Sequence, residues 1–90
     1  MLALERSAKF KADYKREIRT DSYLGTILRP VLENLVQGKP LQDKHRDHGL
    51  SGKWKGYRDC HIKPDLVLIY KKSATVLSLV RLGSHAELFG

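Results

Sequence analysis

Three histidines and an aspartate in the second half of this chain have the side chains and the positions to carry out proton transfer. His48 ends a polar loop, His61 lies near the end of an expected strand, and His85 follows the last expected strand. Asp65 comes directly after Pro64, at the tip of an expected hairpin beside His61. Imidazole changes charge near neutral pH without any perturbation, so three separate elements can bring proton donors and acceptors together.

The chemistry that suits this group is RNA cleavage, in which the ribose 2′-hydroxyl attacks the adjacent phosphate. A base takes the hydroxyl proton, an acid protonates the departing 5′-oxygen, and a cation stabilises the extra charge on the phosphate. Arg81 offers a planar fork of donors to phosphate oxygens. Phe89 is the best candidate for stacking on a base, whereas Trp54 and Tyr57, beside strands, are more typical of a core. This reaction requires no metal ion and no cofactor.

Three questions about this group stay open at the level of sequence. His61 and Asp65 share a face if the hairpin pairs its strands with an even offset, and they point apart if the pairing shifts by one residue. A zinc or transition-metal site built from the three histidines and Asp65 is the competing chemistry, although the spacing lacks a short two-ligand anchor such as HxxxH. Arg81 could equally be an exposed cation at a strand end.

The composition is that of a small basic protein. Ninety residues suffice for one compact domain, residues 1–90, with a single hydrophobic core. The chain has 17 Lys and Arg against 10 Asp and Glu, a formal net charge of +7, which favours nucleic acid through long-range attraction and counterion release. A basic surface that merely maintains solubility is the alternative interpretation, because charge by itself speaks to association rather than to fold.

Cysteine usage and hydropathy favour the cytoplasm. Cys60 is the single cysteine, so neither an intramolecular disulfide nor a paired-thiolate zinc site can form, and we expect Cys60 to pack in the core. The N-terminus lacks the apolar stretch of a signal peptide, and the longest later apolar run, residues 66–70, is too short to span a bilayer. These features predict a cytoplasmic protein that does not associate with membranes.

The first half of the chain predicts a short strand and a helical hairpin. Residues 1–4 can form the strand, and Ser7 can cap a first helix that runs to about Arg19 and carries a basic face. Asp21 or Ser22 can cap a second helix, which has the strongest helical periodicity of the chain. Pro30 lies inside this second helix, where we expect a kink or a restart.

The second half predicts a loop and three strands. Residues 41–53 are polar and aperiodic, as in a loop, and the strands are expected at residues 54–62, 65–71 and 75–82. Short connections favour antiparallel pairing, and the wholly apolar run LVLIY is typical of a central strand buried on both faces. The predicted fold is α+β: a small antiparallel sheet packed by an N-terminal helical hairpin, in the order β-α-α-β-β-β with a short C-terminal tail.

Two sequence runs carry a resemblance to a known family. DHGLSGKWKGYRDCHIKPDLVLIY, residues 47–70, together with RLGSHAELFG, residues 81–90, closely resembles the YafQ branch of the RelE-like bacterial toxins, the mRNA interferases of type II toxin–antitoxin systems. The likeness is specific from Asp47 to the C-terminus, and over the first forty residues it rests on the order of elements. Leu66 departs from the pattern, because some relatives carry tryptophan directly after the aspartate, so codon preference is not carried over.

The resemblance implies a fold, an activity and partners. Family members have a small antiparallel sheet packed by an N-terminal helical hairpin, as in microbial ribonucleases. The implied activity is that of a ribosome-dependent endoribonuclease that enters the A site, cuts mRNA within a codon and stops translation. The implied partners are mRNA, the ribosome and a DinJ- or RelB-like antitoxin, and operator DNA would be met only through the antitoxin complex.

The family's functional residues fall, by matching position, on one set of residues: His48, His61, Asp65, Arg81, His85 and Phe89. In this assignment His85 is the general acid, and His61 and Asp65 lie on the base side. His48 supports proton transfer or substrate positioning. Arg81 binds the scissile phosphate, and Phe89 stacks on a base.

Two other functions are compatible with the sequence. One is a non-catalytic basic module that holds RNA or DNA, for instance as a co-repressor with its antitoxin, and it predicts salt-dependent binding without cleavage. The other is a ribonuclease that works without the ribosome and would cut naked RNA. Clustered histidines and an aspartate argue against the binding module, because lysine and arginine suffice for simple phosphate attraction.

Overall fold

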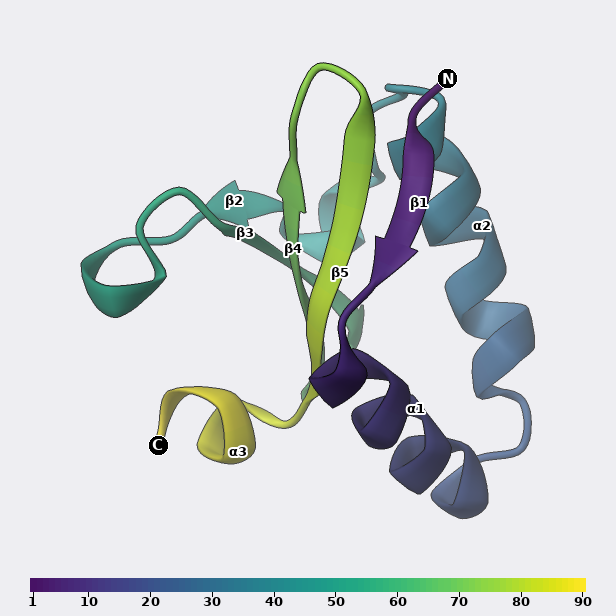
Figure 1. Cartoon of the computed structure of the whole chain (residues 1–90). Coiled ribbons are helices and arrows are strands. Elements are labelled where there is room, and N and C mark those ends of the chain that lie inside the picture. The colour runs from purple at the N-terminus through teal and green to yellow at the C-terminus, as the bar shows by residue number, and fades with distance from the viewer.

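The computed structural model describes residues 1–90 and places five strands in one sheet. The strands are β1 (Ala3–Arg6), β2 (His48–Gly49), β3 (Arg58–Lys63), β4 (Leu66–Lys72) and β5 (Val76–Gly83). They lie in the order β1-β5-β4-β3-β2, and all neighbours are antiparallel except β1, which runs parallel to β5 (Figure 1). With two N-terminal helices this is the predicted α+β fold, in which β2 and a C-terminal helix are additions to the expected order.

The first helix, α1 (Ala8–Thr20), begins at its predicted N-cap. The Ser7 hydroxyl accepts the backbone N–H of Phe10 at 2.9 Å and donates to the carbonyl oxygen of Val80 at 2.7 Å. One hydroxyl therefore caps the helix and ties its start to β5. The strand before it begins at Ala3 rather than Met1.

The second helix, α2 (Leu24–Val36), continues through Pro30 as one element. Of the two expected alternatives, the restart is therefore wrong, since the buried residues of α2 lie on both sides of the proline and hold the helix on the sheet. The kink stays a prediction. The N-cap is Tyr23 rather than Asp21 or Ser22. Asp21 lies two residues before this N-cap, and its carboxylate accepts the backbone N–H of Tyr23 at 2.9 Å. Neither long helix is apolar and long enough to cross a membrane.

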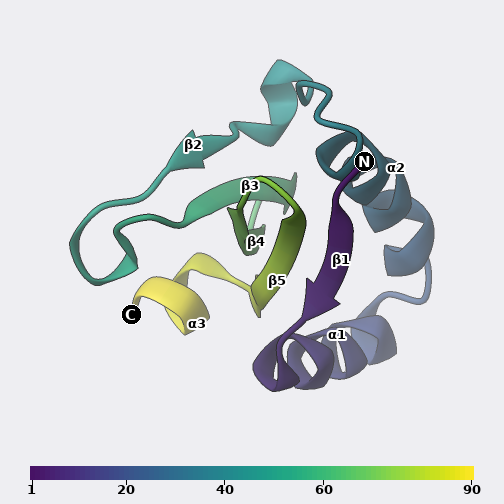
Figure 2. The same cartoon turned by 45° about the horizontal axis from the view of Figure 1, so that its top comes forward.

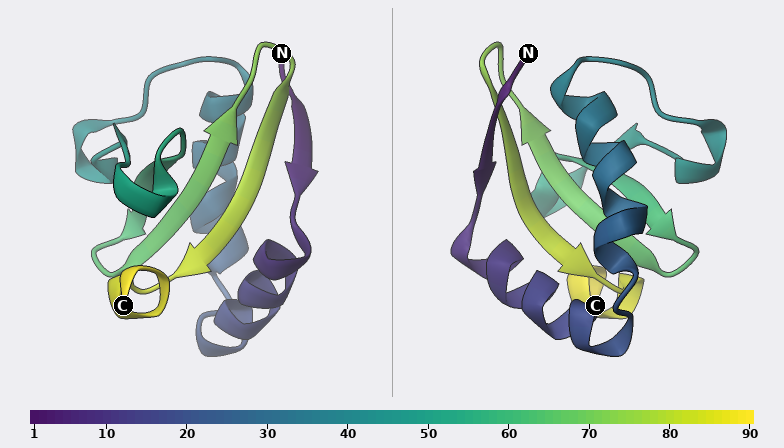
Figure 3. Two further views of the ribbon diagram at one scale, coloured as in Figure 1. Left: turned by 60° about the vertical axis from the view of Figure 1, so that its left-hand side comes forward. Right: turned by 90° about the vertical axis from the view of Figure 1, so that its right-hand side faces the viewer.

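The main core lies between the two helices and one face of the sheet, which α2 crosses (Figure 3, right). Cys60 is fully buried in this core, as predicted. The central strand β4 is also buried on both faces as predicted, since none of residues 66–70 is more than 5% exposed. Its Leu66, Leu68 and Tyr70 face the helices, and Val67 and Ile69 belong to a smaller cluster on the other face.

The other face of the sheet carries the C-terminal helix α3 (His85–Phe89) and the turn η2 (Gly52–Trp54), as the left panel of Figure 3 shows. Leu88 of α3 is buried against β4, and Trp54 and Tyr57 pack around it. The two aromatic rings meet edge to face, 5.4 Å between centroids. They thus belong to a small core, as their position beside strands indicated.

The expected loop at residues 41–53 has local structure. It contains η1 (Asp43–His45), the short strand β2 and the start of η2 (Figure 2). The strand expected to begin at Trp54 begins only at Arg58, because Gly52 and Gly56 adopt positive φ values of 65° and 91° that turn the chain instead of extending it.

Candidate active site

Asp65 and His85 form the closest contact among the predicted site residues. The Nδ1–H of His85 donates to Asp65 Oδ1 at 2.7 Å, and the backbone N–H of His85 donates to the same oxygen at 3.1 Å. These two hydrogen bonds hold the pKa of the exposed Asp65 carboxyl below its usual value. Because Nδ1 is engaged, Nε2 is the ring nitrogen of His85 that is left to exchange a proton with a ligand.

His61 lies beside this pair. Its ring and that of His85 are 5.0 Å apart between centroids and inclined by 73°. Burial, followed by the nearby charge of His85, lowers the pKa of His61 below 6.5. The site thus places an imidazole whose neutral form is favoured next to an imidazole whose Nδ1 is held by a carboxylate.

The register of the strands explains which residues meet. His61 of β3 lies opposite Val67 of β4, and Val67 lies opposite Gly83 of β5, two residues before His85. The pairing of β3 with β4 shifts between His61 and Lys63, so the turn carries Asp65 to α3 rather than into a pair with His61. Asp65 is thus hydrogen-bonded to His85, and it also lies close enough to His61 for the charge of that histidine to act on its carboxyl.

Asp59 is a buried carboxylate in the same neighbourhood that the sequence analysis missed. It is 3% exposed and lies two residues before His61 on β3, so both side chains point to one face of the sheet. Burial raises the pKa of Asp59, against the opposing charges of His48, His61 and His85. The spacing Asp-x-His in an expected strand was the available signal.

His48 faces Asp59 across the β2–β3 pair. Its Nδ1 is 3.2 Å from Asp59 Oδ1 but only 2.6 Å from the carbonyl oxygen of Arg46, to which Nδ1–H donates. Asp59 Oδ1 consequently has no hydrogen-bond partner. The predicted residue His48 is thus part of the group, and it faces the buried carboxylate.

An Asp59→Asn variant should gain stability relative to the parent as the pH rises. A raised pKa means that the folded parent binds more protons than the unfolded chain above the ordinary carboxyl value, so the parent loses stability across that range and the variant does not. Thermal unfolding of both proteins between about pH 4 and pH 7 measures this difference in stability. Each kcal/mol of difference in unfolding free energy shifts Tm by roughly 4–8 °C. Asp43→Asn, at an exposed carboxylate, is the control. A difference in Tm that is independent of pH would contradict the assignment.

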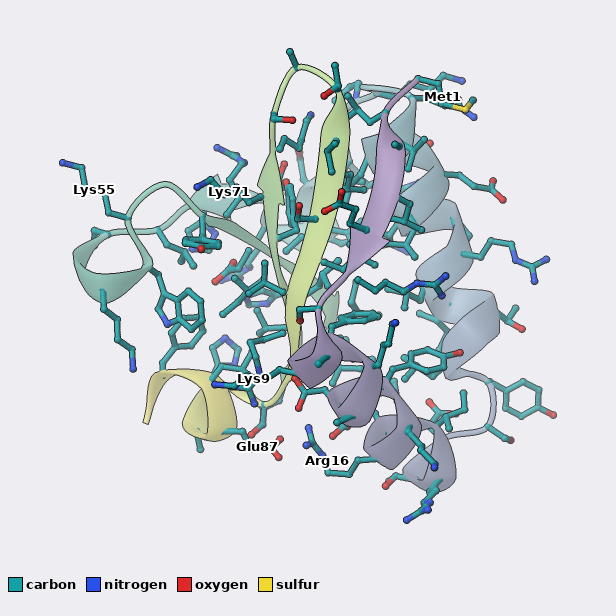
Figure 4. The ribbon with its side chains drawn as sticks, viewed as in Figure 1. Met1, Lys9, Arg16, Lys55, Lys71 and Glu87 are labelled. Carbon is teal, nitrogen blue, oxygen red and sulfur yellow. The ribbon has the colours of Figure 1, made fainter.

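Arg81 is hydrogen-bonded to Asp13 of α1. Its Nε donates to Asp13 Oδ2 at 2.7 Å and one terminal nitrogen donates to Asp13 Oδ1 at 3.3 Å. Asp13 is 3% exposed and also accepts the backbone N–H of Leu82 at 3.0 Å. Arg16 joins this carboxylate to Glu87 of α3, and Figure 4 shows Arg16 and Glu87 facing each other between the two helices. The guanidinium of Arg81 is therefore fixed rather than free at a strand end.

Phe89 is available at the end of α3. Phe89 is 39% exposed. The centroids of the Phe89 and His85 rings are 6.3 Å apart, and the two ring planes are inclined by 40°. An exposed ring beside the acid–base pair can stack on a planar ligand.

No three His, Cys, Asp or Glu side chains are grouped so that they could hold a metal ion. The competing metal site made of the three histidines and Asp65 is thus not preformed. The observed contacts are instead those of coupled proton donors and acceptors, centred on His85.

Comparison with known proteins places the chain in a family. The sequence-family model of YafQ, described as a bacterial toxin of a type II toxin–antitoxin system, matches residues 2–90. The mRNA interferase toxin YafQ of Escherichia coli strain K12 is 39% identical over an aligned region of 93 positions, gaps included. This region covers 97% of this chain and 95% of that protein.

Solved structures agree with this family. YafQ in the E. coli DinJ–YafQ complex superimposes with a TM-score of 0.90 at 36% identity, covering all of both chains. A metal-bound toxin from Helicobacter pylori superimposes with a TM-score of 0.91 at 45% identity, covering 99% of this chain and 100% of that one. The chain belongs to the YafQ family of bacterial toxins of type II toxin–antitoxin systems.

Proposed function

We propose that the chain is an mRNA interferase, an endoribonuclease that cleaves mRNA in the ribosomal A site by attack of the ribose 2′-hydroxyl. The observation that carries this proposal is the Asp65–His85 pair beside His61, whose pKa is lowered. The name of the E. coli relative, an mRNA interferase toxin, supports the same class of activity.

In the proposed reaction His61 is the general base and His85 is the general acid. His61 accepts the proton of the 2′-hydroxyl because burial favours its neutral form. His85 gives its Nε2 proton to the departing 5′-oxygen, and Asp65 holds the opposite ring nitrogen and so orients the imidazole. His48 and Asp59 position the base side, where their charges act on His61.

The phosphate and the base would be held by Arg81 and Phe89. Asp13 occupies Nε and one terminal nitrogen of Arg81, so the other terminal nitrogen is free to donate to a phosphate oxygen. The buried carboxylate fixes the plane of the guanidinium, which reduces the entropy lost when phosphate binds. Phe89 offers its exposed ring to a nucleobase.

The rate of cleavage should persist to lower pH than an unperturbed imidazole would allow. A general base must be deprotonated, and the pKa of His61 lies below 6.5, so the acidic limb of the profile falls below that value. Single-turnover cleavage of ribosome-bound mRNA between about pH 5.5 and pH 8 measures this limb. The base would be assigned to another residue if the acidic limb lay above the ordinary pKa of imidazole. The same would follow if the His61→Ala variant kept the acidic limb of the parent.

The proposed function is tested by comparing mRNA on translating ribosomes with the same mRNA free in solution. We expect cuts within codons on the ribosome and no comparable cutting of free RNA, with activity unchanged by a chelator that is selective for zinc and copper and leaves the Mg²⁺ of the ribosome in place. Equal cutting of naked RNA would instead indicate a ribosome-independent ribonuclease. Salt-dependent binding without any cleavage would indicate a binding module.

We also propose a DinJ/RelB-like antitoxin as the regulatory partner, in the cytoplasm where translation takes place. The solved complex that contains DinJ and YafQ of E. coli supports this partner class. The net charge of +7 favours an antitoxin segment that is rich in acidic residues. Operator DNA would be contacted only through the antitoxin of such a complex.

A further inference from the structure

A second concave surface adjoins the candidate active site. It is a polar groove of about 900 Å³ between α2, the turn η1 and the end of β3, which we call the α2–β3 groove. Its basic and histidine side chains come from two segments: Lys44, His45, Arg46, His61 and Lys63. No Asp or Glu lines the groove. Lys63 is paired with Asp21 outside the lining, whereas Lys44 and Arg46 take part in none of the ion pairs of the molecule.

His61 joins this groove to the reacting centre. It lines the groove and its ring lies 5.0 Å from that of His85. Arg46 is close enough for its positive charge to act on His61. A strand whose phosphate lay between His61 and His85 would therefore have one of its two directions open toward the groove.

The backbone beneath the groove is arranged around Arg46. This residue has φ 47° and ψ 43°, a left-handed conformation that is uncommon for any residue other than glycine, asparagine or aspartate. Its carbonyl oxygen accepts Nδ1–H of His48, so the same residue orients a site histidine and directs a cation to the groove. Left-handed backbone at a bulky residue is a feature that clusters at functional sites.

His45 presents a free ring nitrogen on the same surface. Its Nδ1–H donates to the carbonyl oxygen of His61 at 2.7 Å, so the Nε2 atom is left for a ligand. Asn34 of α2 and Gln42 add neutral amide groups to the lining. The groove thus combines cations for phosphates with hydrogen-bonding groups for ribose and base.

We propose that the α2–β3 groove binds the ribose–phosphate backbone of an RNA strand that extends from the site of cleavage, a proposal that rests on the proposed function. Single-stranded RNA fits this lining because it is a continuous polyanion with hydroxyl and base-edge groups. An acidic protein segment fits less well, since it has no ribose hydroxyl groups or base edges to bind the side-chain amides of Asn34 and Gln42 and the free Nε2 of His45. The strand can belong to mRNA or to ribosomal RNA, which share this chemistry.

The test compares two double variants with the same net charge. Lys44→Gln/Arg46→Asn removes both unpaired cations from the groove, and asparagine tolerates the left-handed backbone of residue 46. Lys11→Gln/Arg29→Gln is the matched control, because these two cations line a separate apolar groove between β1, α1 and α2. Binding of a short, uncleavable 2′-O-methyl single-stranded RNA is measured over a salt series for the full chain and for both variants.

We expect the slope of log K against log salt to become shallower by roughly 1.4 in the groove variant, since each phosphate contact on single-stranded RNA contributes about 0.7. The control should keep the slope of the parent. A shallower slope for binding of the free oligonucleotide would support an mRNA strand. A shallower slope seen only for binding to ribosomes would support ribosomal RNA. The proposal would be overturned if the two double variants had equal slopes both for the free oligonucleotide and for ribosomes. It would also be overturned if the groove variant kept the RNA slope of the parent but bound the antitoxin more weakly.

This readout separates the two proposals because binding does not require cleavage. A chain that cuts mRNA, with a groove variant that binds RNA as the control does, would refute the groove alone. A chain that never cuts, with a groove variant that loses salt dependence, would refute the proposed function and retain the groove as an RNA-binding site.

Discussion

A His85→Ala variant should cleave ribosome-bound mRNA roughly 10²–10⁴-fold more slowly than the parent chain, the usual contribution of a general acid or base. The substitution removes the imidazole that protonates the departing oxygen, and it leaves Asp65 with only the backbone N–H of residue 85 as a donor. Single-turnover cleavage with mapped 5′ ends measures the loss. The effect should be on the chemical step, because Arg81 and Phe89 remain to hold the substrate.

The fold of this variant should be unaffected. The His85 side chain is 46% exposed, and surface substitutions usually change stability by no more than about 0.5 kcal/mol. Asp65→Ala is a useful companion, because it keeps the imidazole and removes only the group that orients it, so a smaller loss is expected. Cleavage by His85→Ala at the parental rate would show that the acid lies elsewhere.

An Asp13→Ala variant should lose roughly 3–5 kcal/mol of unfolding free energy, as expected when one member of a buried ion pair is removed. Asp13 is 3% exposed and receives hydrogen bonds from Arg81, Arg16 and the backbone of Leu82. Without it, the guanidinium of Arg81 and the N–H of Leu82 lose their acceptor, and α1 loses one of its polar attachments to β5. Urea unfolding measures the change.

Two comparisons sharpen this prediction. Arg16→Gln should cost far less, about 1 kcal/mol or below, because the Arg16 side chain is 45% exposed and its ion pairs are screened by water. Burial acts to raise the pKa of Asp13, but bonds from Arg81, Leu82 and Arg16 outweigh it and leave the pKa lowered. Its stabilisation is thus present above the ordinary carboxyl value and lost as pH falls through the folded value. If Asp13→Ala lost no more unfolding free energy than Arg16→Gln, the assignment of Asp13 as the buried partner of Arg81 would be contradicted.

Local sequence signals predicted the elements of this fold well. Ser7 sits before an amphipathic run and caps α1, and the wholly apolar residues 66–70 form the buried central strand. Both depend on interactions within a few residues, which a sequence displays directly. The restart at Pro30 was wrong because packing of α2 on the sheet outweighs one missing hydrogen bond.

The contacts of the site could not be predicted in the same way. Asp65 meets His85, and Asp13 meets Arg81, across 20 and 68 positions of the chain. These partners depend on irregular register between His61 and Lys63 and between Ile69 and Tyr70, and no local pattern specifies such shifts. The resemblance assigned six residues to the site, but it indicated neither of these pairings.

The chemical ends left at the cut test the central claim most directly. Attack by the 2′-hydroxyl with acid catalysis by His85 predicts an upstream fragment ending in a 2′,3′-cyclic phosphate and a downstream fragment beginning with a 5′-hydroxyl. These ends should form on translating ribosomes, and a 2′-deoxy nucleotide at the cut should abolish cleavage. A 5′-phosphate on the downstream fragment, or cutting at the 2′-deoxy position, would contradict the mechanism.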